Sequence, residues 1–162
     1  MTRRGAIRVA LASVGLVAAV AAFAASSGAA GSFAAVHMGF LKTPSRSVYC
    51  DYRYGGATKS FRYVRCGFKG TLVPPEAKPH GGCGVVDYVG NRMVLHQTGR
   101  ARTEPCAGDA GPFANPKAAH TVRYGTAWHG GPFKCTSSKA GMTCRNPGGH
   151  GFFIAHRNWR VF

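Results

Sequence analysis

Six cysteines, all placed after an apolar N-terminal stretch, most strongly restrict what this chain can fold into. An even number of cysteines in an exported protein indicates a disulfide framework. We predict the sequential bridges Cys50–Cys66, Cys83–Cys106 and Cys135–Cys144, while other pairings stay open from the sequence alone. No Cys-x-x-Cys occurs, which argues against a structural zinc site or a thioredoxin-type redox motif.

Residues 1–25 have the layout of a secretory signal peptide. Arg3, Arg4 and Arg8 form a positive segment, an apolar run follows, and small residues after it offer cleavage sites within 24–30. The alternative is an uncleaved membrane anchor, but the run is shorter than the ~20 apolar residues that a membrane-spanning helix needs. We therefore expect a protein that is secreted or held in the cell envelope, with membrane attachment only through an uncleaved signal.

The chain after the signal has the length of one small domain. Residues 26–39 are predicted to be a flexible lead-in and residues 40–162 the folded domain. Short apolar segments alternate with glycine-rich turns, and no segment after the signal keeps a helical period. The prediction is an all-β fold, a small single domain of short antiparallel strands stapled by disulfides. The segments 72–84 and 99–116 are expected to be irregular connections because of their prolines and glycines.

The segments 47–54 and 60–68 are predicted to form the first hairpin. If Cys50 faces Cys66, the other facing pairs are Asp51 with Arg65, Tyr52 with Val64 and Arg53 with Tyr63. An ion pair, an apolar pair and a cation over an aromatic ring are all favourable cross-strand neighbours. This agreement supports the first bridge. A second hairpin is expected around Cys135 and Cys144, followed by a buried strand.

The chain is strongly basic, with 21 Lys and Arg against 5 Asp and Glu and a net charge of +16. Loss of the three arginines in the signal leaves 18 against 5, a net charge of +13. Such a charge attracts anionic polymers but does not identify one. We expect non-specific binding to an anionic cell-envelope polymer or to nucleic acid. Basic residues interleaved with aromatics supply the candidate anion-binding set: Arg53, Arg62, Arg65, Lys69, Arg157 and Arg160.

Enzymatic chemistry has weak support in the sequence. The patterns of serine hydrolases and phosphate-binding loops are absent, and the seven histidines lack the spacing of metal ligands. We therefore expect no metal, no cofactor and no enzymatic activity. The alternative is a small secreted nuclease-like hydrolase, in which His150 or His96 would act with Asp109 as acid and base. For His150, flanked by two glycines, the simpler interpretation is a turn residue.

Several short motifs occur in order along residues 40–162. They are Phe40-x-x-Thr43-Pro44-Ser45, Arg65-Cys66, Cys106-Ala107-Gly108-Asp109, Gly141-x-Thr143-Cys144-x-Asn146 and Gly149-His150-Gly151-Phe152. Together they resemble a family of small exported actinobacterial proteins that carries a domain of unknown function. The resemblance implies export, paired cysteines and one small domain, and it implies no activity.

Overall fold

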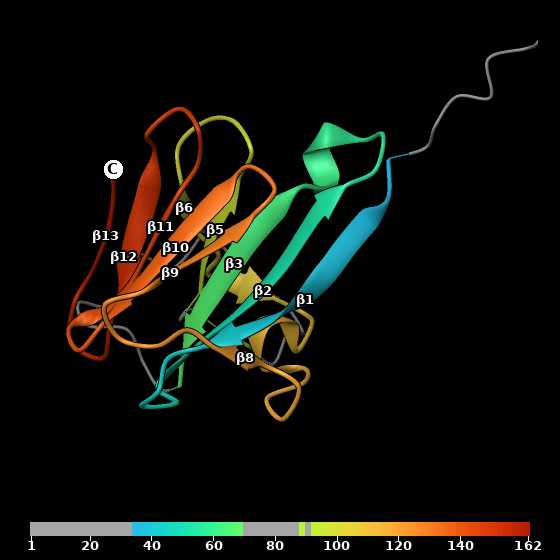
Figure 1. Ribbon diagram of the computed structural model, residues 1–162. Coiled ribbons are helices and arrows are strands. Elements are labelled where there is room, and N and C mark those ends of the chain that lie inside the picture. Colours follow the sequence, from blue (N-terminus) through green and yellow to red (C-terminus); the bar gives the residue numbers. More distant parts are fainter. Residues whose placement is uncertain (1–33, 70–87, 90–91) are drawn as a thin grey trace, which may run out of the picture. The chain divides into compact units, whose positions relative to one another are not determined.

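The computed structural model describes residues 34–69, 88–89 and 92–162, which form an all-β domain (Figure 1). One sheet consists of β1 (Val36–Lys42), β2 (Val48–Gly55), β3 (Tyr63–Phe68), β5 (Arg92–His96), β6 (Arg102–Thr103) and β8 (His120–Thr121). The other consists of β9 (Ala127–Gly130), β10 (Phe133–Ser138), β11 (Gly141–Arg145), β12 (Gly151–Ile154) and β13 (Trp159–Val161). The predicted all-β class is confirmed.

The strand orders are β6-β5-β3-β2-β1-β8 in the six-stranded sheet and β13-β12-β11-β10-β9 in the five-stranded sheet. Neighbouring strands run antiparallel, except that β8 lies parallel to β1. A separate two-stranded ladder joins β4 (Tyr88–Val89) to β7 (Cys106–Ala107). Two short 3₁₀ turns, η1 (Lys59–Phe61) and η2 (Gly111–Phe113), complete the described elements. No helix in the described ranges is long and apolar enough to cross a membrane.

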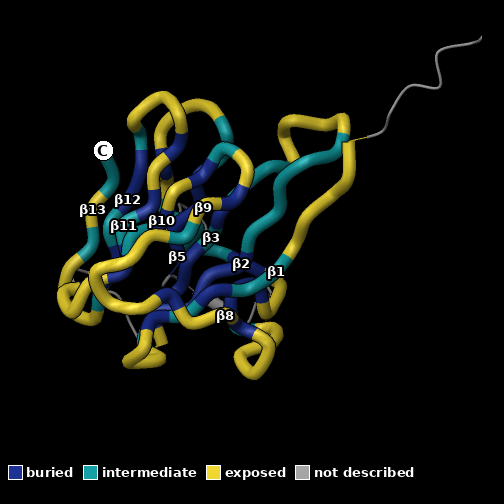
Figure 2. Tube along the Cα trace, in the orientation of Figure 1, coloured by how far each residue is buried: buried dark blue, intermediate teal, exposed yellow. Residues whose placement is uncertain are grey.

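One hydrophobic core takes side chains from both sheets. Figure 2 shows buried stretches, in dark blue, along the central strands of each sheet. The largest fully buried apolar side chains are Leu41, Val48, Val64, Met93 and Leu95 from the six-stranded sheet and Phe133, Met142, Phe152 and Ile154 from the five-stranded sheet. Because side chains alternate across a strand, the residues between these core positions point to the outer faces, where any binding surface must lie.

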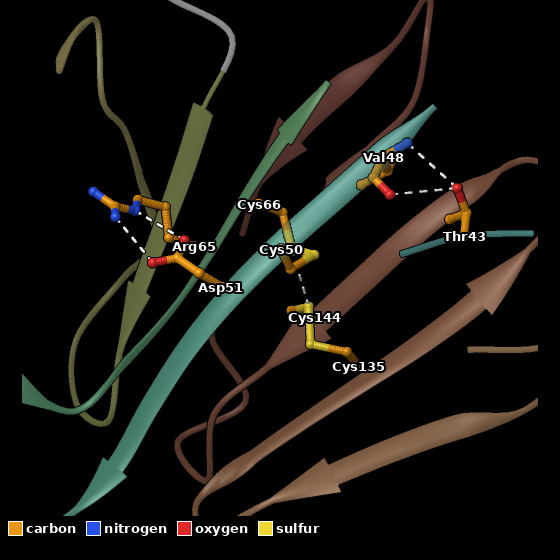
Figure 3. Close-up of a disulfide and its surroundings, with 8 residues drawn as sticks. All are labelled: Thr43, Val48, Cys50, Asp51, Arg65, Cys66, Cys135 and Cys144. Carbon is orange, nitrogen blue, oxygen red and sulfur yellow. Dashed lines mark hydrogen bonds and ion pairs between the residues drawn. A yellow bond between two sulfur atoms is a disulfide. The ribbon is translucent and has the colours of Figure 1, made fainter. Parts of the chain in front are cut away.

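Two disulfides lie in the middle of this core. Cys50–Cys66 joins β2 to β3, and Cys135–Cys144 joins β10 to β11, so each bridge staples two neighbouring strands of one sheet. The two bridges meet, with 3.9 Å between the Sγ atoms of Cys66 and Cys144 (Figure 3). These two predicted bridges are confirmed. Cys83 lies outside the described residues, so its predicted bridge to Cys106 stays a prediction.

The first hairpin has the register expected from its cysteines. Cys50 faces Cys66, and the three further pairs of β2 and β3 match those predicted. One detail differs, because the Arg53 guanidinium lies over the ring of Phe61, at 5.4 Å, whereas the Tyr63 ring carries Arg65, at 5.5 Å. Side chains on a twisted sheet lean along the strand, so a residue two positions away can take the place of the facing one.

The first strand begins earlier than expected. β1 starts at Val36, inside the segment 26–39 that was predicted to be a flexible lead-in, so part of that prediction is corrected. The backbone of β1 pairs with β2 from Val36 to Lys42, but its first three side chains are exposed and show no alternation. Gly39 lies under the Tyr52 ring, where a Cβ would approach the phenol oxygen to 2.5 Å. Backbone hydrogen bonds to β2 therefore form this strand, although its sequence lacks the alternation of apolar and polar residues from which a strand is predicted.

The predicted connections have mixed outcomes. The segment 99–116 contains β6, β7 and η2 rather than irregular chain alone, although each element has only two or three residues. Such short elements carry no periodicity that a sequence window can detect. The predicted connection 72–84, the signal peptide 1–25 and its cleavage region lie outside the described residues.

Candidate functional site

Arg65 forms ion pairs with every acidic side chain in the described ranges. Its Nε and Nη2 donate to the two carboxylate oxygens of Asp51 at 3.0 and 2.9 Å (Figure 3). Its Nη1 reaches Glu104 at 3.4 Å, and both Nη atoms reach Asp109 at 3.3 and 3.1 Å. Burial alone would lower the pKa of Arg65, but Asp51 and then Glu104 and Asp109 outweigh burial and raise it. In this cluster, arginine compensates the negative charge of the described carboxylates on the outer face of the six-stranded sheet.

Asp109 is held by a second arginine. Arg92, whose side chain is only 1% exposed, donates from Nη1 to Asp109 Oδ1 at 2.7 Å and from Nη2 to the Asp109 carbonyl. Gly111 makes room for both guanidinium groups, because a Cβ there would lie 2.8 Å from Arg92 and 2.9 Å from Arg65. Partial burial would raise the pKa of Asp109, but the hydrogen bond from Arg92 and the charge of Arg65 outweigh it and lower that pKa.

The candidate catalytic residues are only partly brought together. His96 and Asp109 line the same hollow of about 340 Å³ on the outer face of the six-stranded sheet. His150 lies in the turn between β11 and β12, where its backbone carbonyl accepts a hydrogen bond from the backbone N–H of Asn146. A carboxylate that two arginines already hold, with a lowered pKa, is a poor proton acceptor. Among the described residues, no group of three or more His, Cys, Asp and Glu side chains is placed to hold a metal.

The acid sensitivity of the fold is expected to depend in part on Asp109. A carboxyl whose folded pKa is depressed contributes stability above its unfolded pKa, ~3.9, and loses that contribution as the pH falls through the folded value. Thermal unfolding followed between about pH 5 and about pH 2 should therefore show a steeper loss for the wild type than for Asp109→Asn. Parallel curves for the two proteins would mean that the arginine contacts of Asp109 add no stability.

The six candidate anion-binding residues do not form one surface. Arg62 donates to the Gly55 and Gly56 carbonyls and to Gln97 Oε1, and Arg65 is neutralised as described. Arg53 lies on the outer face of the six-stranded sheet, whereas Arg160 lies over Phe153 on the five-stranded sheet. The remaining two, Arg157 and Lys69, lie in or beside the turns at one end of the domain.

That end contains a hollow of about 400 Å³, which we call the end cleft. Three turns line it, namely 43–47 between β1 and β2, 138–141 between β10 and β11, and 155–158 between β12 and β13. They contribute the cationic or titratable groups of Lys139, His156 and Arg157 and the hydroxyls of Ser45 and Ser47. No carboxylate is among the described residues that line the cleft, so its chemistry is that of hydrogen-bond donors and positive charge.

The turn 43–47 is built by its own hydroxyl groups. Thr43 Oγ1 accepts a hydrogen bond from the Val48 amide at 3.3 Å (Figure 3) and lies 3.0 Å from Ser45 Oγ, which lies 2.8 Å from Ser47 Oγ. Between these serines, Arg46 has a φ of 56°, the one positive φ of a non-glycine residue in the described ranges. A left-handed arginine costs about 1–2 kcal/mol, a strain of the kind that gathers at binding sites.

A second basic hollow, of about 340 Å³, lies on the other side of this turn. Lys42, Arg46 and Lys117 line it, and the Lys42 Nζ donates to the Pro116 carbonyl at 3.1 Å. Lys69 also adjoins the turn, since its amide donates to the Ser47 carbonyl at 2.9 Å. We call the end cleft and this second hollow together the basic end. The sequence analysis missed this site except for one of its residues, Arg157, and for Lys69 beside it.

Comparison with known proteins places the chain in a family. The sequence profile of DUF6636, a family of unknown function, matches residues 10–162. The chain belongs to this family. The expected membership in a family of unknown function is thereby confirmed. No curated protein matches the chain, and no solved structure does. Because the family description names no activity, function has to be argued from the chemistry of the site.

Proposed function

We propose that this protein is an extracytoplasmic, non-enzymatic domain that binds anionic polymers through its basic end. The observation that carries the proposal is the end cleft, where Lys139, His156 and Arg157 surround hydroxyl groups and no described carboxylate opposes them. Hydroxyl and cationic donors together are the groups that bind phosphate and carboxylate oxygens. The second hollow adds further cations beside the first, as a polymer with repeated negative charges requires.

The distribution of charge supports this choice of surface. The described acidic side chains are all engaged by Arg65, and Asp109 also by Arg92, on the outer face of the six-stranded sheet. Within the described ranges, no carboxylate therefore compensates the charge of the cations at the basic end. In a chain that keeps a net charge of +13 after loss of the three arginines of the signal, such a surface raises the local concentration of polyanions and speeds their association.

The disulfides are compatible with an extracytoplasmic protein, since such bonds persist in oxidising compartments. Export through a cleaved signal peptide is part of our proposal, and the layout of residues 1–25 supports it. An origin in an actinobacterium, where the polymer would belong to the cell envelope, rests on the sequence resemblance alone. The hydrolase alternative gains less support, because Asp109 is a weak base in its arginine contacts.

The test replaces two cations of the end cleft. Lys139→Gln with Arg157→Gln should weaken binding to polyphosphate by about tenfold near 50 mM salt and lower the slope of log K against log salt by roughly 1 to 2. Fluorescence anisotropy with a labelled polyphosphate measures both quantities. The matched control is Lys134→Gln with Arg160→Gln, which removes the same charge from exposed positions on the five-stranded sheet.

An equal loss in both double variants would contradict a localised site and leave only diffuse attraction by net charge. Retention of polyphosphate affinity at high salt by the wild type would also contradict the proposal, because exposed phosphate contacts are strongly screened. Cleavage of the polymer during the measurement would argue for an enzyme instead.

A further inference from the structure

The outer face of the six-stranded sheet carries a row of side chains beside the acidic cluster, which contacts this row at Tyr63. The strand registers place Met38 of β1 opposite Arg53 of β2, Arg53 opposite Tyr63 of β3, and Tyr63 opposite His96 of β5. Facing residues of neighbouring antiparallel strands project to the same side of the sheet. Four strands therefore contribute one continuous line of apolar, aromatic and basic groups, next to the turn η1 that carries Phe61.

The neighbouring rows of the same face are already occupied. The next row contains Asp51 and Arg65, which bind each other, and Glu104 and Asp109 bind Arg65 from the following segments. Beyond it, η2 covers the sheet, with the ring of its Phe113 5.8 Å from that of Tyr49. In the first row Tyr63 donates its hydroxyl to Asp51 at 3.2 Å, so within the described ranges Arg53 and His96 are its members that stay available to a ligand.

A hollow of about 340 Å³ runs over this row and is lined by Arg53, Phe61, Tyr63, His96 and Arg102, among others. Phe61 is 57% exposed, and Met38 at the end of the row is 68% exposed. The Arg53 guanidinium lies 5.4 Å from the centre of the Phe61 ring. With more than half of Phe61 in solvent, enough ring is open for another planar group to stack on it.

The free groups of the hollow select the kind of ligand. Arg53, Arg102 and His96 take part in no ion pair within the described ranges, whereas the carboxylates of Glu104 and Asp109 already accept hydrogen bonds from arginines. A neutral sugar needs acceptors for its hydroxyls, and the carboxylates of this hollow already bind arginines. A phosphate needs cations and donors, and these are free. An aromatic ring beside free arginines suits a ligand that combines a planar base with a phosphate.

We infer that this hollow binds a nucleotide unit of single-stranded nucleic acid, with the base stacked on Phe61 and the phosphate paired with Arg53, which lies beside that ring. The open hollow at the surface admits one strand, since its unstacked bases are accessible in a way that those of a duplex are not. The inference goes beyond the proposed function, because it concerns a different surface and a ligand that is recognised by its aromatic bases. Either can fail without the other.

The test compares two labelled oligonucleotides of about eight residues, one of deoxythymidine and one of the same length without bases, by fluorescence anisotropy. The wild type should bind the deoxythymidine oligonucleotide more tightly. Phe61→Ala should weaken that binding about tenfold, as expected for one base stack of 1–3 kcal/mol, and leave binding of the abasic strand unchanged. Phe61→Tyr should restore binding, and Arg53→Gln should weaken both strands. Phe61 is exposed in a surface turn, and a circular dichroism melt checks that each variant is folded.

Equal binding of the two strands by the wild type would overturn the inference, as would an unchanged affinity in Phe61→Ala. A stronger Phe61-dependent affinity for polygalacturonate than for the oligonucleotide would also overturn it, because the hollow would then select an acidic glycan. The variant with Lys139→Gln and Arg157→Gln separates the two surfaces, since loss at the basic end should affect both strands alike and leave the preference for bases intact.

Discussion

Replacing Cys50 and Cys66 together by alanine is expected to lower the free energy of unfolding by about 3 kcal/mol. The bridge closes a loop of 16 residues, and its loss returns that conformational freedom to the unfolded chain. Both residues are fully buried, so the missing sulfurs also leave a gap in the core. Urea unfolding followed by tryptophan fluorescence measures the change.

The second bridge provides the comparison. Replacing Cys135 and Cys144, which are 9 residues apart, should cost about 2.5 kcal/mol on the same entropic estimate. Because the two bridges touch through Cys66 and Cys144, removal of both should differ from the sum of the separate losses by at least about 0.5 kcal/mol. A loss below about 1 kcal/mol for the first pair would show that packing, and not the cross-link, holds β2 to β3.

Arg65→Gln is expected to lower the free energy of unfolding by about 3 kcal/mol. The Asp51 side chain is only 10% exposed and would lose its guanidinium partner. Breaking a buried pair by removing one member costs about 3–5 kcal/mol, mostly because the other charge stays desolvated. We take the low end, since Asp109 and Glu104 are more exposed and water can reach them.

Two further variants separate this effect from a general loss of charge. Asp51→Asn combined with Arg65→Gln should recover part of the stability, because no unpaired charge is then buried. Arg102→Gln, an exposed arginine on the same face, should change stability by no more than about 0.5 kcal/mol. Equal losses for Arg65→Gln and Arg102→Gln would contradict the role assigned to the cluster.

The part of the fold that could be predicted from sequence is the part held by local constraints. In the first hairpin, one assumed bridge sets the facing pairs of both strands, and the structure has the same pairs. The start of β1 was not predicted, because backbone groups make its pairing while its first three side chains are exposed. The short elements within 99–116 were not predicted, because two or three residues are too few to show a periodic pattern.

Little of the candidate site could be predicted from the sequence, for a related reason. The end cleft is assembled from turns that follow Thr43, Ser138 and Ala155, and no spacing rule connects segments so far apart. Charge counting suggested anion binding but could not distinguish Arg65, which three carboxylates neutralise, from Arg157, which forms no ion pair within the described ranges. A basic residue in a turn between two predicted strands is the only signal that pointed toward the basic end.

The contact between the two bridges has a consequence for how the protein acquires its native pairing. With 3.9 Å between the sulfurs of Cys66 and Cys144, a thiolate left on either residue would lie within reach of the other bridge. Attack by such a thiolate transfers the bond and releases a different cysteine, so no net oxidant is consumed. A single-cysteine substitution such as Cys50→Ser would thus create the nucleophile for exchange and allow a bond between the sheets in place of one within a sheet. Closure of both hairpin bridges before the sheets come together would leave no thiolate for this exchange.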